Sequence, residues 1–185
     1  TCALPISEGT RFRPGVNIGT DITWEDLRRR YDAVVVATGA MVPRDLPIPG
    51  RDLSGVHFAM EYLAQSNRAV DGQPVTDQIH AQGKHVVVLG GGDTGADCIG
   101  TAHRHQASSV TNLAIGKQPP VERADNQPWP TFPNLFEVTS AHEEGGTREF
   151  LVSTVEFLGD SNGNVRAVRV AETEFVDGAR VPKAG

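Results

Sequence analysis

The chain has 185 residues, of which 38% are hydrophobic and 22% are charged, so a packed core is expected and disorder is not. Its net charge of −6 excludes a general nucleic-acid binder, because phosphate binding needs a basic surface. No apolar run reaches the roughly 18 residues of a membrane span, and two cysteines are too few for a disulfide framework or a zinc site.

Both ends of the chain resemble cut ends. Residues 1–6 resemble the read-through translation of a sequencing-adapter oligonucleotide and are set aside as non-native, although a native origin stays open. The chain stops at residues 183–185, directly after a strand-like segment, and it has no initiator Met. We therefore interpret the sequence as an internal piece of a longer protein.

The N-terminal part shows one helix signal and two strand signals. Residues 11–18 are mildly apolar and suggest a short strand. Thr23 can cap a helix whose first turn carries Glu25 and Asp26, where the helix dipole favours anions. Residues 31–39 are a β-branched run that ends in glycine, which is typical of a strand buried on both faces of a parallel sheet.

A proline-rich linker follows and marks the predicted domain boundary. Prolines at 43, 47 and 49, with Gly50, exclude regular structure there. Apolar residues at helical spacing then predict a helix over residues 56–65, with its apolar stripe in the core. Residues 68–83 are predicted to be a polar loop.

The central part predicts one βαβ unit. Residues 84–89 are predicted to form a second buried strand and lead into a glycine-rich segment at 90–95. A helix is expected from there to about His105, and a third strand over residues 109–115. Prolines exclude regular structure from residues 116–135, and a loop of this length is usually functional.

The last part predicts an antiparallel hairpin. Residues 150–158 and 165–176 alternate like strands, and the six residues 159–164 between them are a strong turn signal. The predicted fold class is therefore α/β, with a Rossmann-type parallel sheet, a glycine-rich βα turn and an appended antiparallel hairpin or meander.

The glycine spacing predicts a dinucleotide site. Gly90-x-Gly92-x-x-Gly95 follows a predicted strand and opens a predicted helix, as the fingerprint requires. The first glycine permits the tight turn, the second lets the backbone approach the pyrophosphate, and the third lets the helix pack closely on the strand. Helix N–H groups and the dipole then favour the phosphates. The candidate cofactor-binding residues here are Gly90, Gly91, Gly92, Asp93, Thr94 and Gly95.

The end of the next strand selects the nucleotide. NAD-binding folds usually place an acid there for the ribose 2′-hydroxyl, yet the stretch from Leu113 to Lys117 has none. An acid would repel a 2′-phosphate, so its absence permits NADPH. Lys117 and Arg123 are the candidate partners of that phosphate, and Arg104 is a weaker one.

Four stretches resemble a known family. Residues 87–98 are similar to the NADPH-binding motif of the small subunit of bacterial glutamate synthase, and residues 126–130 and 140–146 resemble segments of this subunit in particular. The stretch Ala37-Thr38-Gly39-Ala40 resembles the strand end that marks the flavin domain in the wider superfamily of flavoproteins with two dinucleotide-binding domains. The similarity spans roughly residues 11–182.

The resemblance implies an activity and a domain layout. Such enzymes pass hydride from NADPH to FAD, and electrons leave through iron–sulfur clusters to a large subunit that makes glutamate. Residues 7–46 would be part of the FAD-binding domain, with Ala37, Thr38 and Gly39 at the flavin, and residues 47–182 the NADPH-binding domain. The cysteine-rich iron–sulfur region and the first flavin glycine motif are absent, so no catalysis by this piece alone is expected.

The remaining residues suggest no further chemistry. No catalytic dyad or metal-ligand spacing is visible, and Cys98 is predicted to be a buried small residue. With no secretory signal, a cytoplasmic location is expected. Two alternatives stay open beside the glutamate synthase hypothesis: a non-catalytic nucleotide-binding regulatory module, or a related NADPH–flavin electron-transfer subunit.

Overall fold

The computed structural model describes residues 6–40 and 42–184, and the chain divides into two compact units at Val42 and Pro43. This division falls slightly before the predicted domain boundary at residues 46 and 47. The assignment of the two units to a flavin domain and a nucleotide domain stays a prediction.

The N-terminal unit contains the predicted helix α2 (Trp24–Arg30). Its cap is the one expected from the sequence, because the Thr23 hydroxyl accepts a hydrogen bond from the Asp26 backbone N–H at 3.1 Å. Glu25 and Asp26 lie in the first turn, where the helix dipole stabilises their charge.

The two strands predicted in this unit are wrong. Residues 31–40 form no strand, and the side chain of Val35 is 88% exposed instead of buried. Residues 11–18 form none either, apart from a single bridge between Ile18 and Ile22. A strand exists only through hydrogen bonds to a neighbouring strand, and the described part of the chain offers these segments no such neighbour.

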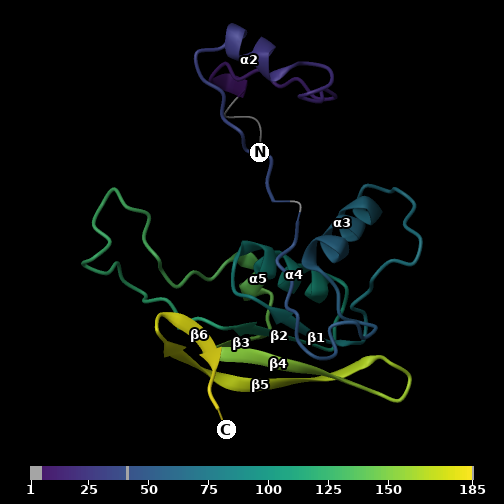
Figure 1. Cartoon of the computed structure of the whole chain (residues 1–185). Helices are drawn as coiled ribbons and strands as arrows, with labels where there is room; N and C mark the ends of the chain where they lie inside the picture. The colour runs from purple at the N-terminus through teal and green to yellow at the C-terminus, as the bar shows by residue number, and fades with distance from the viewer. Residues whose placement is uncertain (1–5, 41, 185) are drawn as a thin grey trace. The chain divides into compact units, whose positions relative to one another are not determined.

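The C-terminal unit is built around a parallel sheet with helices on one side (Figure 1). The sheet has the strand order β1-β2-β3, and both strand pairs are parallel. Its strands are β1 (His85–Leu89), β2 (Ser109–Ala114) and β3 (Thr147–Phe150). Its helices are α3 (Ala59–Val70), α4 (Asp93–Arg104) and α5 (Ser140–Glu143).

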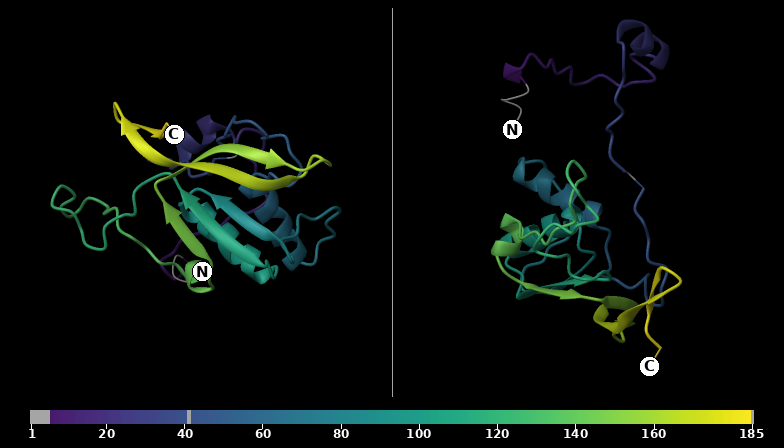
Figure 2. Two further views of the ribbon diagram at one scale, coloured as in Figure 1. Left: turned by 90° about the horizontal axis from the view of Figure 1, so that it is seen from below. Right: turned by 90° about the vertical axis from the view of Figure 1, so that its left-hand side faces the viewer.

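An antiparallel sheet lies on the other side of the parallel one, as the view from below shows (Figure 2). Its strands are β4 (Val152–Gly159), β5 (Val165–Val176) and β6 (Ala179–Pro182). The predicted hairpin is confirmed: in its turn the Asp160 carboxylate accepts hydrogen bonds from the backbone N–H groups of Asn162 and Asn164. The Rossmann-type parallel sheet with an antiparallel meander is thus the observed fold class.

Strands β3 and β6 were not predicted as separate elements. Leu151 has φ +58° and separates β3 from β4, so the strand predicted over 150–158 corresponds to β4 and shares only Phe150 with β3. The turn before β6 contains Asp177 and Gly178, both with positive φ. An Asp-Gly pair between alternating segments is a strong hairpin signal, so β6 was open to prediction.

The βαβ unit β1–α4–β2 is confirmed, and the core lies between the helices and the parallel sheet.

Helix α3 begins at Ala59 and ends at Val70, later at both ends than predicted. It buries Tyr62 and Leu63, as its apolar stripe implied. The run at 84–89 was predicted to be a buried strand, yet β1 is only partly buried, since Val87 is 43% exposed. β1 is an edge strand, and helices cover only one of its faces.

The end of the linker and the residues that follow it are bonded to the antiparallel sheet. The Pro49 carbonyl accepts a hydrogen bond from the Phe157 N–H at 2.9 Å, and the Ser54 N–H donates to the Gly163 carbonyl at 3.0 Å. Gly50 has φ +78°, and a Cβ there would overlap the Phe157 carbonyl oxygen. This close approach ties residues 49–54 to the β4–β5 hairpin.

Candidate functional site

The glycine-rich turn connects β1 to the N-terminus of α4. Gly90 has φ +112°, a conformation that favours glycine, and its N–H donates to the Leu113 carbonyl at 2.9 Å. Gly92 is the N-cap residue of α4 and supplies no side chain to satisfy the first N–H groups of the helix. Those N–H groups are therefore available to an anion at the turn.

The three fingerprint glycines differ in the space around them. A Cβ built on Gly92 would meet no atom within 4 Å, so the space beside it is open. A Cβ on Gly95 would lie 2.6 Å from the Gly90 carbonyl oxygen, closer than packing allows. The turn thus has an open side at Gly92 and a closely packed side at Gly95, an arrangement that fits a pyrophosphate approaching the backbone.

The residues between these glycines lie at the helix start and beside β2. A Cβ on Gly91 would stand 3.2 Å from the Ala114 Cβ, so the turn abuts the last residue of β2. Asp93 and Thr94 are exposed in the first turn of α4. The Asp93 side chain lines a groove between α3, α4 and α5, together with Asp97. For phosphate binding, the backbone N–H groups of Asp93 and Thr94 are the useful parts.

Sequence reasoning missed Asn112, which holds the turn in place. Its side chain is 1% exposed in the middle of β2, and its amide donates to the carbonyls of Gly90 at 2.6 Å and Val88 at 3.1 Å. An asparagine is unusual in a buried strand. Asn112 alternates with Val110 and Ala114 on the buried face of β2, and a polar residue on this otherwise apolar face was the signal that could have found it.

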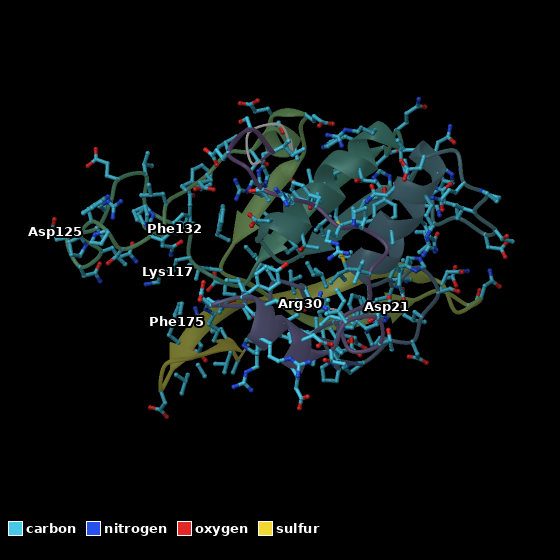
Figure 3. The ribbon with its side chains drawn as sticks, turned by 90° about the horizontal axis from the view of Figure 1, so that it is seen from above. Asp21, Arg30, Lys117, Asp125, Phe132 and Phe175 are labelled. Atoms are coloured by element: carbon cyan, nitrogen blue, oxygen red, sulfur yellow. The ribbon has the colours of Figure 1, made fainter. Side chains whose placement is uncertain are left out.

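The carboxyl end of β2 presents a cation and no acid, as predicted. Lys117 is exposed, and its Nζ lies 5.2 Å from the centre of the Phe175 ring on β5. Figure 3 shows these two side chains side by side. Because Leu113 is the register partner of Leu89, the last residue of β1, this end of β2 and the glycine turn share one edge of the sheet.

The two arginine candidates have other partners. Arg123 donates from Nη1 to the carbonyls of Gln127 at 2.7 Å and Thr131 at 2.8 Å. These bonds tie the start of the long loop to its middle. Arg104 lies in the last turn of α4, at the end opposite the glycine turn, and pairs with Glu144. Arg104 is thus far from the turn, whereas Arg123 still has Nε and Nη2 for an anion.

The flavin candidates lie in the N-terminal unit. Ala37, Thr38 and Gly39 are exposed and irregular, and Gly39 has φ +72°. A Cβ on Gly39 would meet no atom within 4 Å. The described residues of this unit contain no second strand–glycine turn–helix arrangement around them.

Burial shifts the pKa of three groups on or beside helices α3 and α4. It raises the pKa of the Cys98 thiol to about 11, so this cysteine is a protonated core residue, as predicted, and not a redox thiol. Burial also raises the pKa of Tyr62 to about 12. Burial and the nearby His80 lower the pKa of His105, whose Nδ1 is hydrogen-bonded to the Tyr62 hydroxyl at 3.0 Å.

Across residues 6–40 and 42–184, no helix is both long and apolar enough to cross a bilayer. The same residues hold no cluster of three or more potential metal-ligating side chains among His, Cys, Asp and Glu.

A βαβ unit with a glycine turn at the helix N-terminus defines the class of Rossmann-type dinucleotide-binding folds. The family model for pyridine nucleotide-disulphide oxidoreductases matches residues 17–128. The chain belongs to the pyridine nucleotide-disulphide oxidoreductase family.

Within that family the chain is similar to glutamate synthases. It is 52% identical to a glutamate synthase [NADPH] small chain of Mycobacterium tuberculosis, over 97% of this chain and 38% of the relative. It is 40% identical to the Bacillus subtilis small chain, over 94% of this chain and 37% of the relative. A glutamate synthase [NADH] of Schizosaccharomyces pombe is 42% identical over 96% of this chain and 9% of its own length. The chain thus spans well under half the length of each.

Solved structures agree on the fold. The oxidoreductase FprA of Mycobacterium tuberculosis matches with a TM-score of 0.51 at 19% identity, over 91% of this chain and 49% of that one. At this identity the likeness supports the fold alone.

Proposed function

We propose that this chain is the pyridine-nucleotide lobe, with part of the flavin lobe, of an NADPH-dependent glutamate synthase small chain. The whole enzyme would pass hydride from NADPH to FAD, and electrons would continue through iron–sulfur clusters to a glutamate-forming large subunit. The 52% identity to a glutamate synthase [NADPH] small chain supports this proposal.

The observation that carries it is the geometry of the glycine turn. The turn offers a positive-φ glycine at Gly90, open space at Gly92 and close packing at Gly95, directly at the N-terminus of α4. A merely tight βα connection would need no open space on the helix-start side. The residues present therefore fit a dinucleotide pyrophosphate.

In this proposal the chain binds and orients, and none of its side chains is catalytic. NADPH supplies the hydride when bound. The N–H groups of Gly92 to Gly95 hold the pyrophosphate, and the open face at Gly92 lets it approach. Lys117 and Arg123 are the proposed partners of the 2′-phosphate. No general acid or base is needed for hydride transfer between two cofactors.

The domain layout is proposed on the same basis. Residues 7–46 would be a flavin-domain segment, with Ala37, Thr38 and Gly39 beside FAD, and residues 47–182 the nucleotide domain. Residues 1–6 and 183–185 lie outside both. The exposed β-branched run at 34–36 fits a strand whose sheet neighbours come from the rest of the flavin lobe. The iron–sulfur ligands would lie elsewhere in the whole protein, which we place in the cytoplasm.

Calorimetric titration of the chain with NADPH and NADH tests the nucleotide site. NADPH should bind with a stoichiometry near one, and Gly92→Val should remove binding. A second assay joins the complete small chain to the large subunit and follows NADPH oxidation with glutamine and 2-oxoglutarate. Nucleotide binding without any electron transfer would favour the regulatory alternative, and reduction of another acceptor would favour a related electron-transfer subunit.

A further inference from the structure

The side chain of Arg180, on β6, lies against the carboxyl end of β2. If Gly116 carried a Cβ, that atom would stand 3.8 Å from both Cζ and Nη1 of Arg180 and 3.9 Å from Nη2. Three nearly equal distances mean that the guanidinium turns its face toward the space that a side chain at position 116 would occupy. A residue more than 60 positions away in the sequence thus reaches the strand end that selects the nucleotide.

Phe175 is a neighbour of both Arg180 and Lys117. Phe175 is the direct register partner of Arg180 in the antiparallel pair β5–β6, so both side chains project from the same face of that pair. The Lys117 Nζ lies 5.2 Å from the centre of the same ring. Among the described residues, neither cation is ion-paired with a carboxylate. Two unpaired positive charges therefore flank Phe175.

Hydrogen bonds fix β5 and β6 against the end of β2. The Leu151 N–H donates to the Gly116 carbonyl at 2.9 Å, and the Thr173 N–H donates to the Leu151 carbonyl at 2.8 Å. The buried hydroxyls of Ser153 and Thr173 are bonded at 2.8 Å. These contacts hold Phe175 and Arg180 in a defined place beside Gly116.

The pair of cations also lies on the same edge as the glycine turn. Gly91 abuts Ala114, and Gly116 follows only two residues later. Adjacent strands lie about 4.8 Å apart, so an adenosine whose pyrophosphate rests on the turn would place its ribose over the end of β2.

We propose that Arg180 and Lys117 together bind the 2′-phosphate of NADPH, with Phe175 as the neighbour that the two cations share. This inference rests on the proposed nucleotide site and adds a specificity-determining residue from the antiparallel sheet. Arg180 offers the planar fork suited to a phosphate, and Lys117 adds a point charge. One relative is named for NADPH and another for NADH. Local residues, rather than the fold, must therefore set the preference for one nucleotide.

The test uses two ligands that differ by the 2′-phosphate alone, adenosine 2′,5′-bisphosphate and 5′-AMP. Calorimetry of Arg180→Gln should show bisphosphate binding weakened about 10- to 100-fold, with 5′-AMP unchanged. Lys117→Gln should act in the same sense. Arg169→Gln is the matched control: it removes an exposed arginine from β5, about 20 Å from Phe175 at 3.3 Å per residue, and should change neither ligand.

The outcomes separate this inference from the proposed function. If Arg180→Gln loses affinity equally for both ligands, or for neither, the inference is overturned. NADPH binding to the wild type would still support the proposed nucleotide site. A wild type that binds no dinucleotide overturns both. If thermal unfolding shows Arg180→Gln to be misfolded, Arg180→Lys decides. It keeps the charge without the fork and should weaken the bisphosphate alone by several-fold, and an unchanged bisphosphate affinity in it overturns the inference.

Discussion

The side-chain amide of Asn112 donates a 2.6 Å hydrogen bond to the carbonyl oxygen of Gly90 and a second bond to Val88, the residue before the end of β1. One buried side chain on β2 therefore fixes both the strand and the first residue of the glycine turn. The precision of the proposed pyrophosphate site depends on a residue that cannot touch the nucleotide.

Asn112→Leu should lower both stability and NADPH affinity. Leucine has the same branched shape but is larger and donates no hydrogen bond, which leaves the carbonyls of Val88 and Gly90 without their amide partner. We expect the free energy of unfolding to fall by about 1–3 kcal/mol. The NADPH affinity should fall further than it does in the control Thr111→Val, a neighbouring substitution on β2. Urea unfolding and calorimetry measure the two effects. Unchanged affinity in a folded Asn112→Leu protein would contradict the positioning role.

Substitutions at Gly92 and Gly95 should fail in different ways. Gly92→Val places its side chain in open space, so the fold should survive while NADPH binding is lost. Gly95→Val forces the helix away from Gly90 and should cost about 1–3 kcal/mol of stability. Circular dichroism and calorimetry on both proteins separate these results. A folded Gly92→Val protein with normal NADPH binding would show that the site lies elsewhere.

Arg123→Ala should weaken NADPH binding about 10- to 100-fold and leave NADH nearly unchanged, if a free guanidinium nitrogen reaches the 2′-phosphate. Its Nη1 also holds the loop through Gln127 and Thr131, so limited proteolysis of residues 118–135 should be run in parallel. Equal losses for both nucleotides, together with faster cleavage, would assign Arg123 to the loop alone.

The chain should bind NADPH and not retain FAD. The glycine turn of the described residues is assigned to NADPH, and residues 31–40 have no sheet neighbours to build a flavin site. The protein is purified with excess FAD, freed of unbound flavin and examined by visible spectroscopy. A stoichiometric flavin band would reverse the assignment of the two units.

Stability should fall as the pH drops below about 6.5, in part through His105. Burial and His80 lower its pKa in the folded protein, so the unfolded chain takes up the proton first as pH falls through the unfolded value of about 6.5. The loss should be complete at the lower folded pKa. Tm measured from pH 8 to 5 should fall less steeply in His105→Gln than in the wild type. An identical slope in both would assign the pH dependence to other groups.

The elements that the sequence determined by itself are those with local causes. The Thr23 cap, the α4 start after the glycine turn and the hairpin turn at 159–164 each depend on residues a few positions apart, so their chemistry is visible in a short window. The absence of an acid after β2 was visible in the same way.

Tertiary structure decided what depends on distant partners. The β-branched run at 31–39 has strand composition, yet composition cannot supply a neighbouring strand, and the segment is irregular. Asn112 stabilises the turn only because β2 lies beside β1, and Arg180 reaches Gly116 only because the antiparallel sheet folds back across the end of β2. Such contacts join residues 22 and 64 positions apart, and no local pattern records them, because the packing of the sheets alone brings these residues together.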